Sequence, residues 1–422
     1  MKTIKRLLQP LILEALQSFP AVYINGPRQA GKTTLARTLL AKEFKAKYIT
    51  FDDPLERAAA MRNPLGYVRE SGIPLIIDEV QMAPNIFRSL KMLIDEQRME
   101  ALSSSSAAAS SSANGHYLLT GSANLMVIPE LADAMVGRMA TLTLLPLSAS
   151  EVKNSTSHFL DYCFTKDFSK IKADNTKLTE IMRQASFPEL MQMPESMVDK
   201  WLGNYIQKVT LEDPRYIYNL EKAEFMPALL QSLAVRAGNL INDASIGREI
   251  GLNVVTTRNY RALLNGTFVT NTLSPWYRNI TKRLVKSDKI FFHDTMLLCY
   301  LLQSTPEELV KNQPSRFGHV LENFVLSELC KANFASGEKV NISFYRTNDG
   351  REVDFILEKQ NKLVAIEVKH AENINDKDLA GIKEFQAHTG NDFCCGIVLC
   401  NTPRVIAYGK DIYLVPFSAL WQ

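Results

Sequence analysis

The sequence has little of what would place the protein in a membrane, in an oxidising compartment or on zinc. No run of about 18 or more apolar residues occurs, which excludes a membrane-spanning helix of the usual length. The six cysteines, among them the neighbours Cys394 and Cys395, show none of the paired spacings of zinc ligands, and most lie in apolar stretches. We therefore expect buried thiols, with neither disulfide bonds nor zinc.

A large excess of charge is also absent. The chain has 48 Lys and Arg against 45 Asp and Glu, a net charge of +3, so any contact with nucleic acid must come from local clusters. The N-terminal stretch, in which Lys2, Lys5 and Arg6 lead into an amphipathic segment, lacks the pattern of a signal peptide. We expect a soluble, cytoplasmic protein.

What the chain does have is length and apolar content. Its 422 residues are 46% hydrophobic, which is enough for several cores. A chain of this length exceeds one ordinary core, so we expect about two to four domains.

A phosphate-binding loop is the most informative motif. The sequence from Gly26 to Thr34 follows the apolar run Ala21–Ile24 and precedes a helix-forming run, which is the setting of a P-loop that binds ATP. Lys32 is expected to reach the β- and γ-phosphates and Thr33 to hold Mg²⁺. A chance match in a glycine-containing turn is the alternative. The residues predicted to contact the nucleotide are Gly26, Pro27, Arg28, Gln29, Ala30, Gly31, Lys32, Thr33 and Thr34.

A second strand supplies the acidic partner of this loop. Residues 74–79 are a short apolar strand that ends in Asp78 and Glu79, and ligands bind at the carboxyl ends of parallel strands. Asp78 is predicted to hold Mg²⁺ through its water shell, and Glu79 to orient and polarise the water that attacks the γ-phosphate. The alternative is that two carboxylates merely end a strand.

Two more residues are candidates for the ATP site. The strand Tyr117–Thr120 is followed by Ser122, which is placed to sense the γ-phosphate, although it would equally serve as a helix cap. Arg138 precedes a strand at Ala140–Leu145 and is a candidate arginine finger, in cis or from a neighbouring subunit. A surface arginine is the default alternative. The Ser- and Ala-rich residues 103–113 are predicted to form a flexible loop.

These motifs, with Leu145-Pro-Leu-Ser148 and Phe187-Pro-Glu189, resemble a family of prokaryotic AAA-type ATPases whose C-terminal half is a domain of uncharacterised function. The resemblance covers nearly the whole chain. It implies an α/β fold with a P-loop ATPase domain at 1–150, a helical connector at 151–240, a winged-helix-like region at 241–305 and a restriction-endonuclease-like domain at 306–422. This chain has Ala185 and Ser186 where two glycines are expected, so the turn before Phe187 departs from the family pattern.

The middle of the chain has the pattern of a helix–turn–helix, with Gly251 in the turn and Asn253 as the cap of a second helix. Residues 268–273 are expected to form a wing strand. We predict that Val255, Tyr260, Leu263 and Leu264 face the core, and that Thr256, Thr257, Arg258 and Arg261 face solvent or a DNA groove.

A basic run follows, and with it residues 256–286 become a candidate surface for double-stranded DNA. Winged helices also bind proteins, and a basic run is often only a solvated face. The run consists of Arg278, Lys282, Arg283 and Lys286, next to Trp276 and Tyr277.

The last segment contains the spacing of the PD-(D/E)xK nucleases. Glu367 and Lys369 are two apart in a strand and share a face, beside Asp354 of the preceding strand. Asp354 and Glu367 are predicted to bind Mg²⁺, with Glu322 of a helix as a further ligand, and Lys369 to stabilise hydroxide and the developing charge. A surface salt-bridge ladder is the alternative.

Together the motifs predict a Mg²⁺-dependent ATPase whose nucleotide state controls a DNA-directed, nuclease-like domain, in a monomer or a homo-oligomer. One alternative is a nucleotide-gated regulatory protein with a nuclease fold that does not cleave. Another is a signalling ATPase whose partner is a protein.

Overall fold

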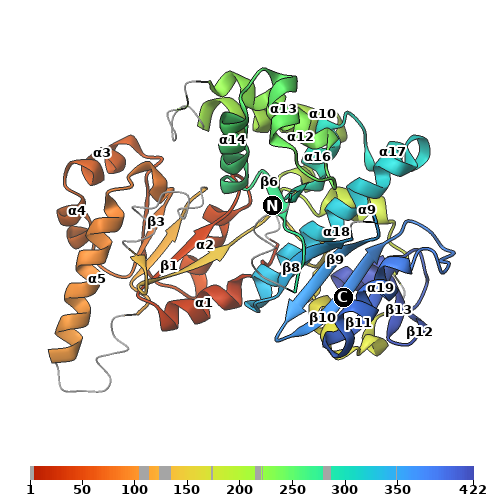
Figure 1. Ribbon diagram of the computed structural model, residues 1–422. Helices are drawn as coiled ribbons and strands as arrows, with labels where there is room; N and C mark the ends of the chain where they lie inside the picture. The colour runs from red at the N-terminus through yellow and green to blue at the C-terminus, as the bar shows by residue number, and fades with distance from the viewer. Residues whose placement is uncertain are drawn as a thin grey trace.

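The computed structural model describes residues 4–103, 114–122, 135–172, 174–213, 220, 222–278, 287–347 and 349–422. An N-terminal α/β part lies beside a larger part that contains the rest of the chain (Figure 1). The predicted loop residues 104–113 and the basic residues Lys282, Arg283 and Lys286 lie outside the described ranges.

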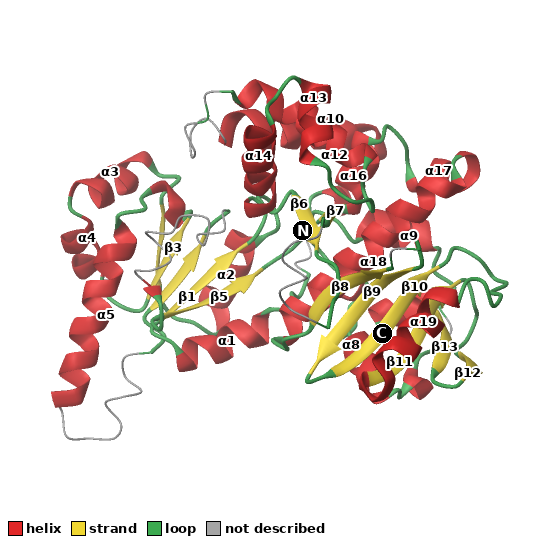
Figure 2. Cartoon of the chain, viewed as in Figure 1, coloured by secondary structure: helices red, strands yellow, loops and turns green. Residues whose placement is uncertain are grey.

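The N-terminal part is built on a five-stranded parallel sheet in the order β2-β3-β4-β1-β5. Helices cover both of its faces (Figure 2). The strands are β1 Ala21–Asn25, β2 Lys47–Thr50, β3 Leu75–Asp78, β4 Tyr117–Thr120 and β5 Met139–Thr143. The helices are α1 Gln9–Ser18, α2 Lys32–Lys42, α3 Pro54–Arg62, α4 Pro64–Ser71 and α5 Ile86–Ser103.

The sheet has a hydrophobic cluster on each face. Alternate residues of a strand point to opposite faces, and accordingly Tyr23 of β1 joins the cluster that includes Phe87 of α5, whereas Val22 joins the one that includes Leu35 of α2. Every residue of β1, β3 and β4 is buried. The parallel pairing places the carboxyl ends of β1 and β3 at the same edge of the sheet, with β4 between them.

The middle of the chain is mostly helical and contains one antiparallel pair, β6 with β7. Gly251 ends α13 in the left-handed conformation, and the side chain of Asn253 accepts from the N–H of Thr256 to cap α14, as the sequence predicts. The elements are α7 Ala149–Val152, α8 Phe159–Thr165, α9 Leu178–Gln184, α10 Glu195–Gln207, a π-helical turn Lys208–Glu212, α12 Met226–Val235, α13 Asp243–Ile250, α14 Val254–Gly266, β6 Thr270–Leu273, β7 Lys289–Phe292, α16 Thr295–Leu301 and α17 Pro306–Asn312.

The prediction for the buried face of α14 is partly wrong. Tyr260, Leu263 and Leu264 are buried as predicted, but Thr257 is fully buried and Val255 is 62% exposed. Positions 257, 260 and 264 recur on one side of a helix, and Val255 lies off that side. The small hydroxyl of Thr257 is accommodated because it donates to the backbone carbonyl of Asn253.

The C-terminal part contains a six-stranded mixed sheet in the order β12-β13-β11-β10-β9-β8. Strands β8, β9 and β10 are antiparallel neighbours, whereas β10, β11 and β13 run parallel. The elements are α18 Pro314–Ser336, β8 Asn341–Arg346, β9 Glu352–Lys359, β10 Lys362–Val368, α19 Ala380–Thr389, β11 Phe393–Cys400, β12 Ile406–Gly409 and β13 Ile412–Pro416.

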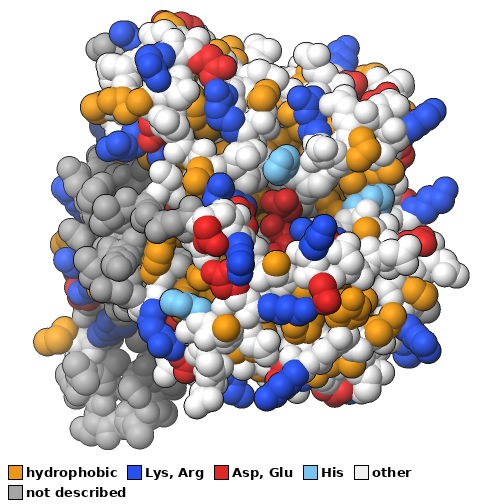
Figure 3. All heavy atoms as spheres, turned by 45° about the vertical axis from the view of Figure 1, so that its right-hand side comes forward, with side chains coloured by type: hydrophobic (Ala, Val, Ile, Leu, Met, Phe, Trp, Pro, Cys, Tyr) orange, Lys and Arg blue, Asp and Glu red, His pale blue; other side chains and the backbone are white. Residues whose placement is uncertain are grey.

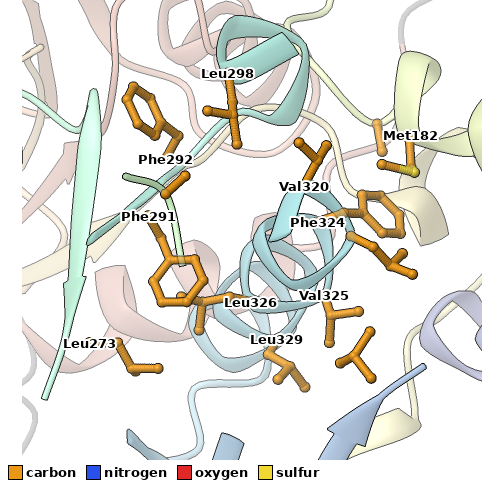
Figure 4. Packing of buried hydrophobic residues seen from close by; sticks show 14 of the residues in the cluster. Met182, Leu273, Phe291, Phe292, Leu298, Val320, Phe324, Val325, Leu326 and Leu329 are labelled. Atoms are coloured by element: carbon orange, nitrogen blue, oxygen red, sulfur yellow. The ribbon is translucent and has the colours of Figure 1, made fainter. Parts of the chain in front are cut away.

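The middle and C-terminal parts share one hydrophobic cluster, which runs from Ala149 to Trp421. Helix α18 is at its centre, where Phe324 and Val325 contribute to packing that also involves Phe291 of β7 and Met182 of α9 (Figure 4). The predicted boundaries near residues 240 and 305 therefore fall inside a common core.

No helix in the described part of the chain has the length and apolar character needed to cross a membrane.

Candidate functional site: a phosphate loop and a separate carboxylate cluster

The backbone of the loop between β1 and α2 requires its two glycines. Gly26 has φ +142°, and a Cβ there would lie 2.0 Å from the carbonyl oxygen of Leu144, so any larger residue would clash with the backbone. Gly31 begins α2 with φ +92°. The loop therefore turns tightly and presents the N-terminus of α2 to the pocket.

Lys32 supplies a buried cation inside this loop. Its ammonium group donates to the carbonyl oxygens of Gly26 at 3.0 Å and Pro27 at 2.7 Å, and the residue is 5% exposed. Burial lowers the pKa of Lys32 to about 8, while the Glu79 carboxylate opposes that shift. The side chain is therefore mostly charged at neutral pH, beside the position predicted for the phosphates.

Asp78 lies at the tip of β3 and contacts the loop, as predicted. The hydroxyl of Thr33 donates to its two carboxylate oxygens at 3.1 and 2.9 Å, the hydroxyl of Tyr48 donates at 2.7 Å, and Thr120 donates as well. The polar atoms of these side chains are hydroxyl and carboxylate oxygens, the ligand type that Mg²⁺ prefers. Thr33 and Asp78 therefore fit a Mg²⁺ site completed by phosphate and water.

Glu79 and Ser122 are joined by a residue that the sequence analysis missed. Glu79 directly follows β3 and has φ +55°, in the left-handed region. The amide of Gln81 donates to the Glu79 carboxylate and to the hydroxyl of Ser122, the latter at 3.0 Å. Gln81 is 7% exposed. A polar residue between Val80 and Met82 was the only sign of it in the sequence.

A pocket of about 460 Å³ opens beside these residues. Its floor includes Lys32, Thr33 and Glu79, and its roof comes from the middle region. The roof residues are Pro188, Glu189, Trp201, Asn204, Tyr205 and Lys208. A second pocket of about 790 Å³ adjoins it, since both are lined by Gly31, Thr34, Pro188 and Glu189.

The Phe-Pro-Glu element holds this roof in place. Glu189 accepts from the indole N–H of Trp201 at 2.8 Å, and the ring of Phe187 lies 4.7 Å from that of Tyr205. Ala185 has φ −77° and ψ 60°, and the N–H of Ser186 donates to the carbonyl oxygen of Gln184 at 2.9 Å, so this tight turn does not need the positive φ that favours glycine. Ser186 donates to Asp294 at 2.7 Å, which ties the turn to the core.

The prediction that Arg138 is an arginine finger in cis is wrong. Arg138 precedes β5, and its carbonyl accepts from the N–H of Ala21, the first residue of β1. In a parallel sheet the starts of the strands lie at the edge opposite the phosphate loop. The guanidinium is paired with the carboxylate of Asp95 at 2.6 and 2.9 Å. A role across a subunit boundary stays a prediction.

The predicted DNA-facing residues of α14 are mostly engaged within the protein. Arg261 makes two hydrogen bonds to Asp243, at 2.8 and 2.9 Å, and its side chain is 14% exposed. Arg258 lies 3.5 Å from the same carboxylate but is 66% exposed. Thr256 is half-buried. On this helix Arg258 remains the cation best placed to reach a ligand, and the predicted role of Arg261 is wrong.

In the described part of the basic run, Trp276 is buried whereas Arg278 is exposed. Trp276 is 3% exposed and its ring lies 5.1 Å from that of Phe385, so it belongs to the core of the C-terminal sheet rather than to a binding face. Arg278 pairs with Asp392 at 2.9 Å and is 63% exposed. The prediction that Trp276 belongs to a phosphate-contacting surface is therefore wrong.

Asp354 and Glu367 come together as the spacing predicts. The antiparallel register pairs Ile366 with Phe355, and the next residues along the two strands are Glu367 and Asp354. Asp354 accepts from the backbone N–H of Val368 at 2.8 Å, and both carboxylates are buried. The ammonium group of Lys369 lies 3.2 Å from Glu367.

Burial and, after it, like charge both raise the pKa of the carboxyls at this site. Burial raises the pKa of Glu367 well above its usual value, and Asp354 raises it further. Burial, followed by the charge of Asp354, raises the pKa of Glu322 on α18 to about 8. Figure 3 shows Asp and Glu side chains gathered near the middle of the face that it presents, with Lys, Arg and His side chains around them.

The three carboxylates do not form one metal-binding group. Within the described ranges no cluster of three or more His, Cys, Asp or Glu residues is placed to hold a metal ion. Glu322 instead lies 3.8 Å from the imidazole of His319, on its own helix. The prediction of Glu322 as a ligand beside Asp354 and Glu367 is therefore wrong, and a metal here would rely on these two carboxylates and backbone or water oxygens.

Three successive segments of the chain match known protein families. Residues 18–153 match a family described as an AAA domain, and residues 175–308 and 317–420 match two families described as domains of unknown function, DUF8612 and DUF4143. The chain is 28% identical over 357 residues to an uncharacterized protein of Mycobacterium tuberculosis. This alignment covers 84% of this chain and 71% of that protein. An uncharacterized protein of Methanocaldococcus jannaschii is 23% identical over 353 residues, or 80% and 72% of the two chains.

Among solved structures, the Walker-type ATPase PABY2304 of Pyrococcus abyssi aligns with 70% of this chain and 94% of its own length, at 13% identity and a TM-score of 0.37. The AAA match covers the phosphate loop and the tip of β3. The N-terminal part therefore resembles a P-loop ATPase domain of the AAA type. Residues 317–420 match a domain family of unknown function.

Proposed function

We propose that the protein binds Mg²⁺-ATP in the pocket between the phosphate loop and α10, and hydrolyses it. The observation that carries the proposal is the meeting of Lys32, Thr33 and Asp78 at one edge of the sheet, under a roof contributed by the middle region. The triphosphate would lie in the pocket of about 460 Å³, and the nucleoside in the adjoining pocket of about 790 Å³.

Each residue has a distinct task in this reaction. Lys32 and the N–H groups at the start of α2 hold the phosphate oxygens. Thr33 and Asp78 would hold Mg²⁺, which neutralises charge on the phosphates when it is bound. Glu79 orients the attacking water and polarises its O–H bond. Gln81 fixes the direction of the Glu79 carboxylate.

Because α10 and the turn after it form the roof, the nucleotide contacts both halves of the chain. Of the roof residues, Tyr205 belongs to the hydrophobic cluster that includes residues of α18 and the C-terminal sheet, and Trp201 packs against that cluster. Packed hydrophobic side chains therefore connect the nucleotide pocket to the strands β9 and β10, which carry the carboxylates. We infer that the nucleotide state sets the arrangement of the C-terminal part.

The Glu79→Gln variant tests the hydrolytic role. Gln keeps the size of the side chain but cannot accept a proton, so hydrolysis is expected to slow by about tenfold or more while ATP binding is retained. Binding is measured by titration calorimetry and turnover by phosphate release. Glu70→Gln, at an exposed position of α4, is the matched control. Unchanged turnover in the Glu79 variant would remove Glu79 from the mechanism.

A second activity, cleavage of double-stranded DNA, is favoured by the adjacent Asp354, Glu367 and Lys369. Two strand carboxylates with a lysine two residues on can hold a divalent metal and stabilise charge on a phosphodiester. The segment α12–α14 with β6 and β7, which has the order of a winged helix, would bring DNA to this site through exposed cations such as Arg258.

This second activity is tested with linear double-stranded DNA, Mg²⁺ or Mn²⁺, and either ATP or ADP. Asp354→Asn and Lys369→Ala are each expected to reduce cleavage by about a hundredfold, because each removes a charge that the transition state needs. Asp376→Asn, on an exposed loop, is the control. An intact substrate with the wild-type protein under all four conditions would instead favour the non-cleaving, regulatory alternative.

A further inference from the structure

Arg28, inside the phosphate loop, joins the AAA domain to the middle region. Its Nε–H donates to Oδ2 of Asp213, the residue that directly follows the π-helical turn Lys208–Glu212. The two side chains are 25% and 12% exposed, so this ion pair is largely shielded from solvent. Arg28 also lines the pocket of about 460 Å³. The pair therefore connects the pocket wall to the segment that forms part of the roof.

The charges around Arg28 place it at the phosphate end of the pocket. Burial lowers the pKa of the guanidinium, but Asp213 and, less strongly, Glu79 more than offset that shift and raise it. The charge of Arg28 in turn helps burial to lower the pKa of Lys32. Two cations held near one another in a shielded pocket favour an anion between them. Glu79, which would orient water at the γ-phosphate, is one of the groups whose charge acts on Arg28.

Among the residues that the structure describes, the hydrogen bond to Asp213 leaves donors of the guanidinium for such an anion. Arginine carries five N–H groups in a planar fork, and the contact with Asp213 uses the one on Nε. The two Nη groups can then donate to a phosphate while Asp213 fixes the plane of the fork. ADP lacks the terminal phosphate, so it would leave these donors without that partner.

We propose that Arg28 reads the γ-phosphate of ATP and that Asp213 is the positioning residue that aims it. The proposal rests on the proposed ATP site and adds a means of telling ATP from ADP. With ATP bound, Arg28 is held from both sides, and residues 208–213 are anchored to the phosphate loop. With ADP bound, only the ion pair with Asp213 remains, and the segment is held less firmly.

The test is the ratio of the ATP and ADP dissociation constants, measured by titration calorimetry on the full chain. Arg28→Ala is expected to weaken ATP binding by about tenfold to a hundredfold, the usual range for a charge-assisted hydrogen bond, and ADP binding by less than about threefold. Asp213→Asn should shift the ratio in the same direction by a smaller factor. Arg62→Ala, at an exposed site on α3, is the matched control and should leave the ratio unchanged.

Arg28→Lys guards against a simple folding defect, because it keeps the charge but lacks the fork that reaches both partners. It should lose most of the preference for ATP. A second readout is amide hydrogen exchange of residues 208–213, which should be slower with a non-hydrolysable ATP analogue than with ADP, and equal for both in Arg28→Ala. If Arg28→Ala weakens both nucleotides equally or neither, the proposal fails. If the wild-type protein binds neither nucleotide, the ATP site itself fails.

Discussion

The phosphate site and the C-terminal site both place carboxylates at or near the ends of buried strands, but their charges are balanced differently. Asp78 is surrounded by hydroxyl donors from Thr33, Tyr48 and Thr120, and Lys32 lies in the adjoining loop. Asp354 and Glu367 instead face each other, and burial together with this like charge raises the pKa of Glu367.

The two sites differ in the charge of the ligand that each one favours. The site at the phosphate loop has a buried cation and N–H donors, which favour an anionic ligand. The C-terminal site has neighbouring carboxylates, opposed by the ammonium group of Lys369, which is 36% exposed. Burial alone would lower the pKa of Lys369, but Glu367 and Asp354 raise it. The C-terminal site therefore favours a proton or a cation. This contrast between the two sites can be tested with variants of either one.

The largest expected effect comes from removing the cation of the phosphate site. Lys32→Ala should weaken ATP binding by about a hundredfold or more, because it removes a charged donor from a buried cradle. Titration calorimetry gives the affinity, and Lys47→Ala, at an exposed position at the start of β2, is the control. Tight ATP binding by the Lys32 variant would break the comparison, since the site would then not be organised around this cation.

The phosphate site was predictable because its parts are local or follow from sheet topology. The loop from Gly26 to Lys32 is one strand–loop–helix unit. Asp78 ends a neighbouring parallel strand, and the carboxyl ends of parallel strands share an edge. The same rule, applied to Arg138, predicts the opposite edge, because Arg138 precedes its strand instead of following it.

The parts that could not be predicted depend on packing between distant segments. The roof residue Trp201 is far along the chain from the loop that it faces, and no local pattern marks it. The buried face of α14 is set by which side meets the core, so Val255 and Thr257 were exchanged in the prediction. Glu322 has the helical placement expected of a nuclease ligand, but within the described residues it does not form a metal-binding group with Asp354 and Glu367, and no spacing in the sequence fixes how a helix residue lies relative to two strands.

The smaller effect is on the pH dependence of stability. In the folded protein, burial and Asp354 raise the pKa of Glu322 from 4.5 to about 8. Between these two values the folded chain binds more protons than the unfolded chain, so the protonated carboxyl stabilises the fold at low pH, and this contribution is lost as the pH rises toward 8. The slope for one such group is at most about 1.4 kcal/mol per pH unit.

Glu322→Gln should reduce the fall in the free energy of unfolding as the pH rises, because the amide stays neutral at every pH. Thermal unfolding followed between pH 5 and pH 8 measures the slope for both proteins, and Glu307→Gln, a half-exposed residue of α17, is the control. An equally steep fall in the Glu322 variant would show that this carboxyl is charged in the fold throughout that range. The C-terminal site would then carry its negative charge without needing a proton, and the contrast with the phosphate site would rest on Asp354 and Glu367 alone.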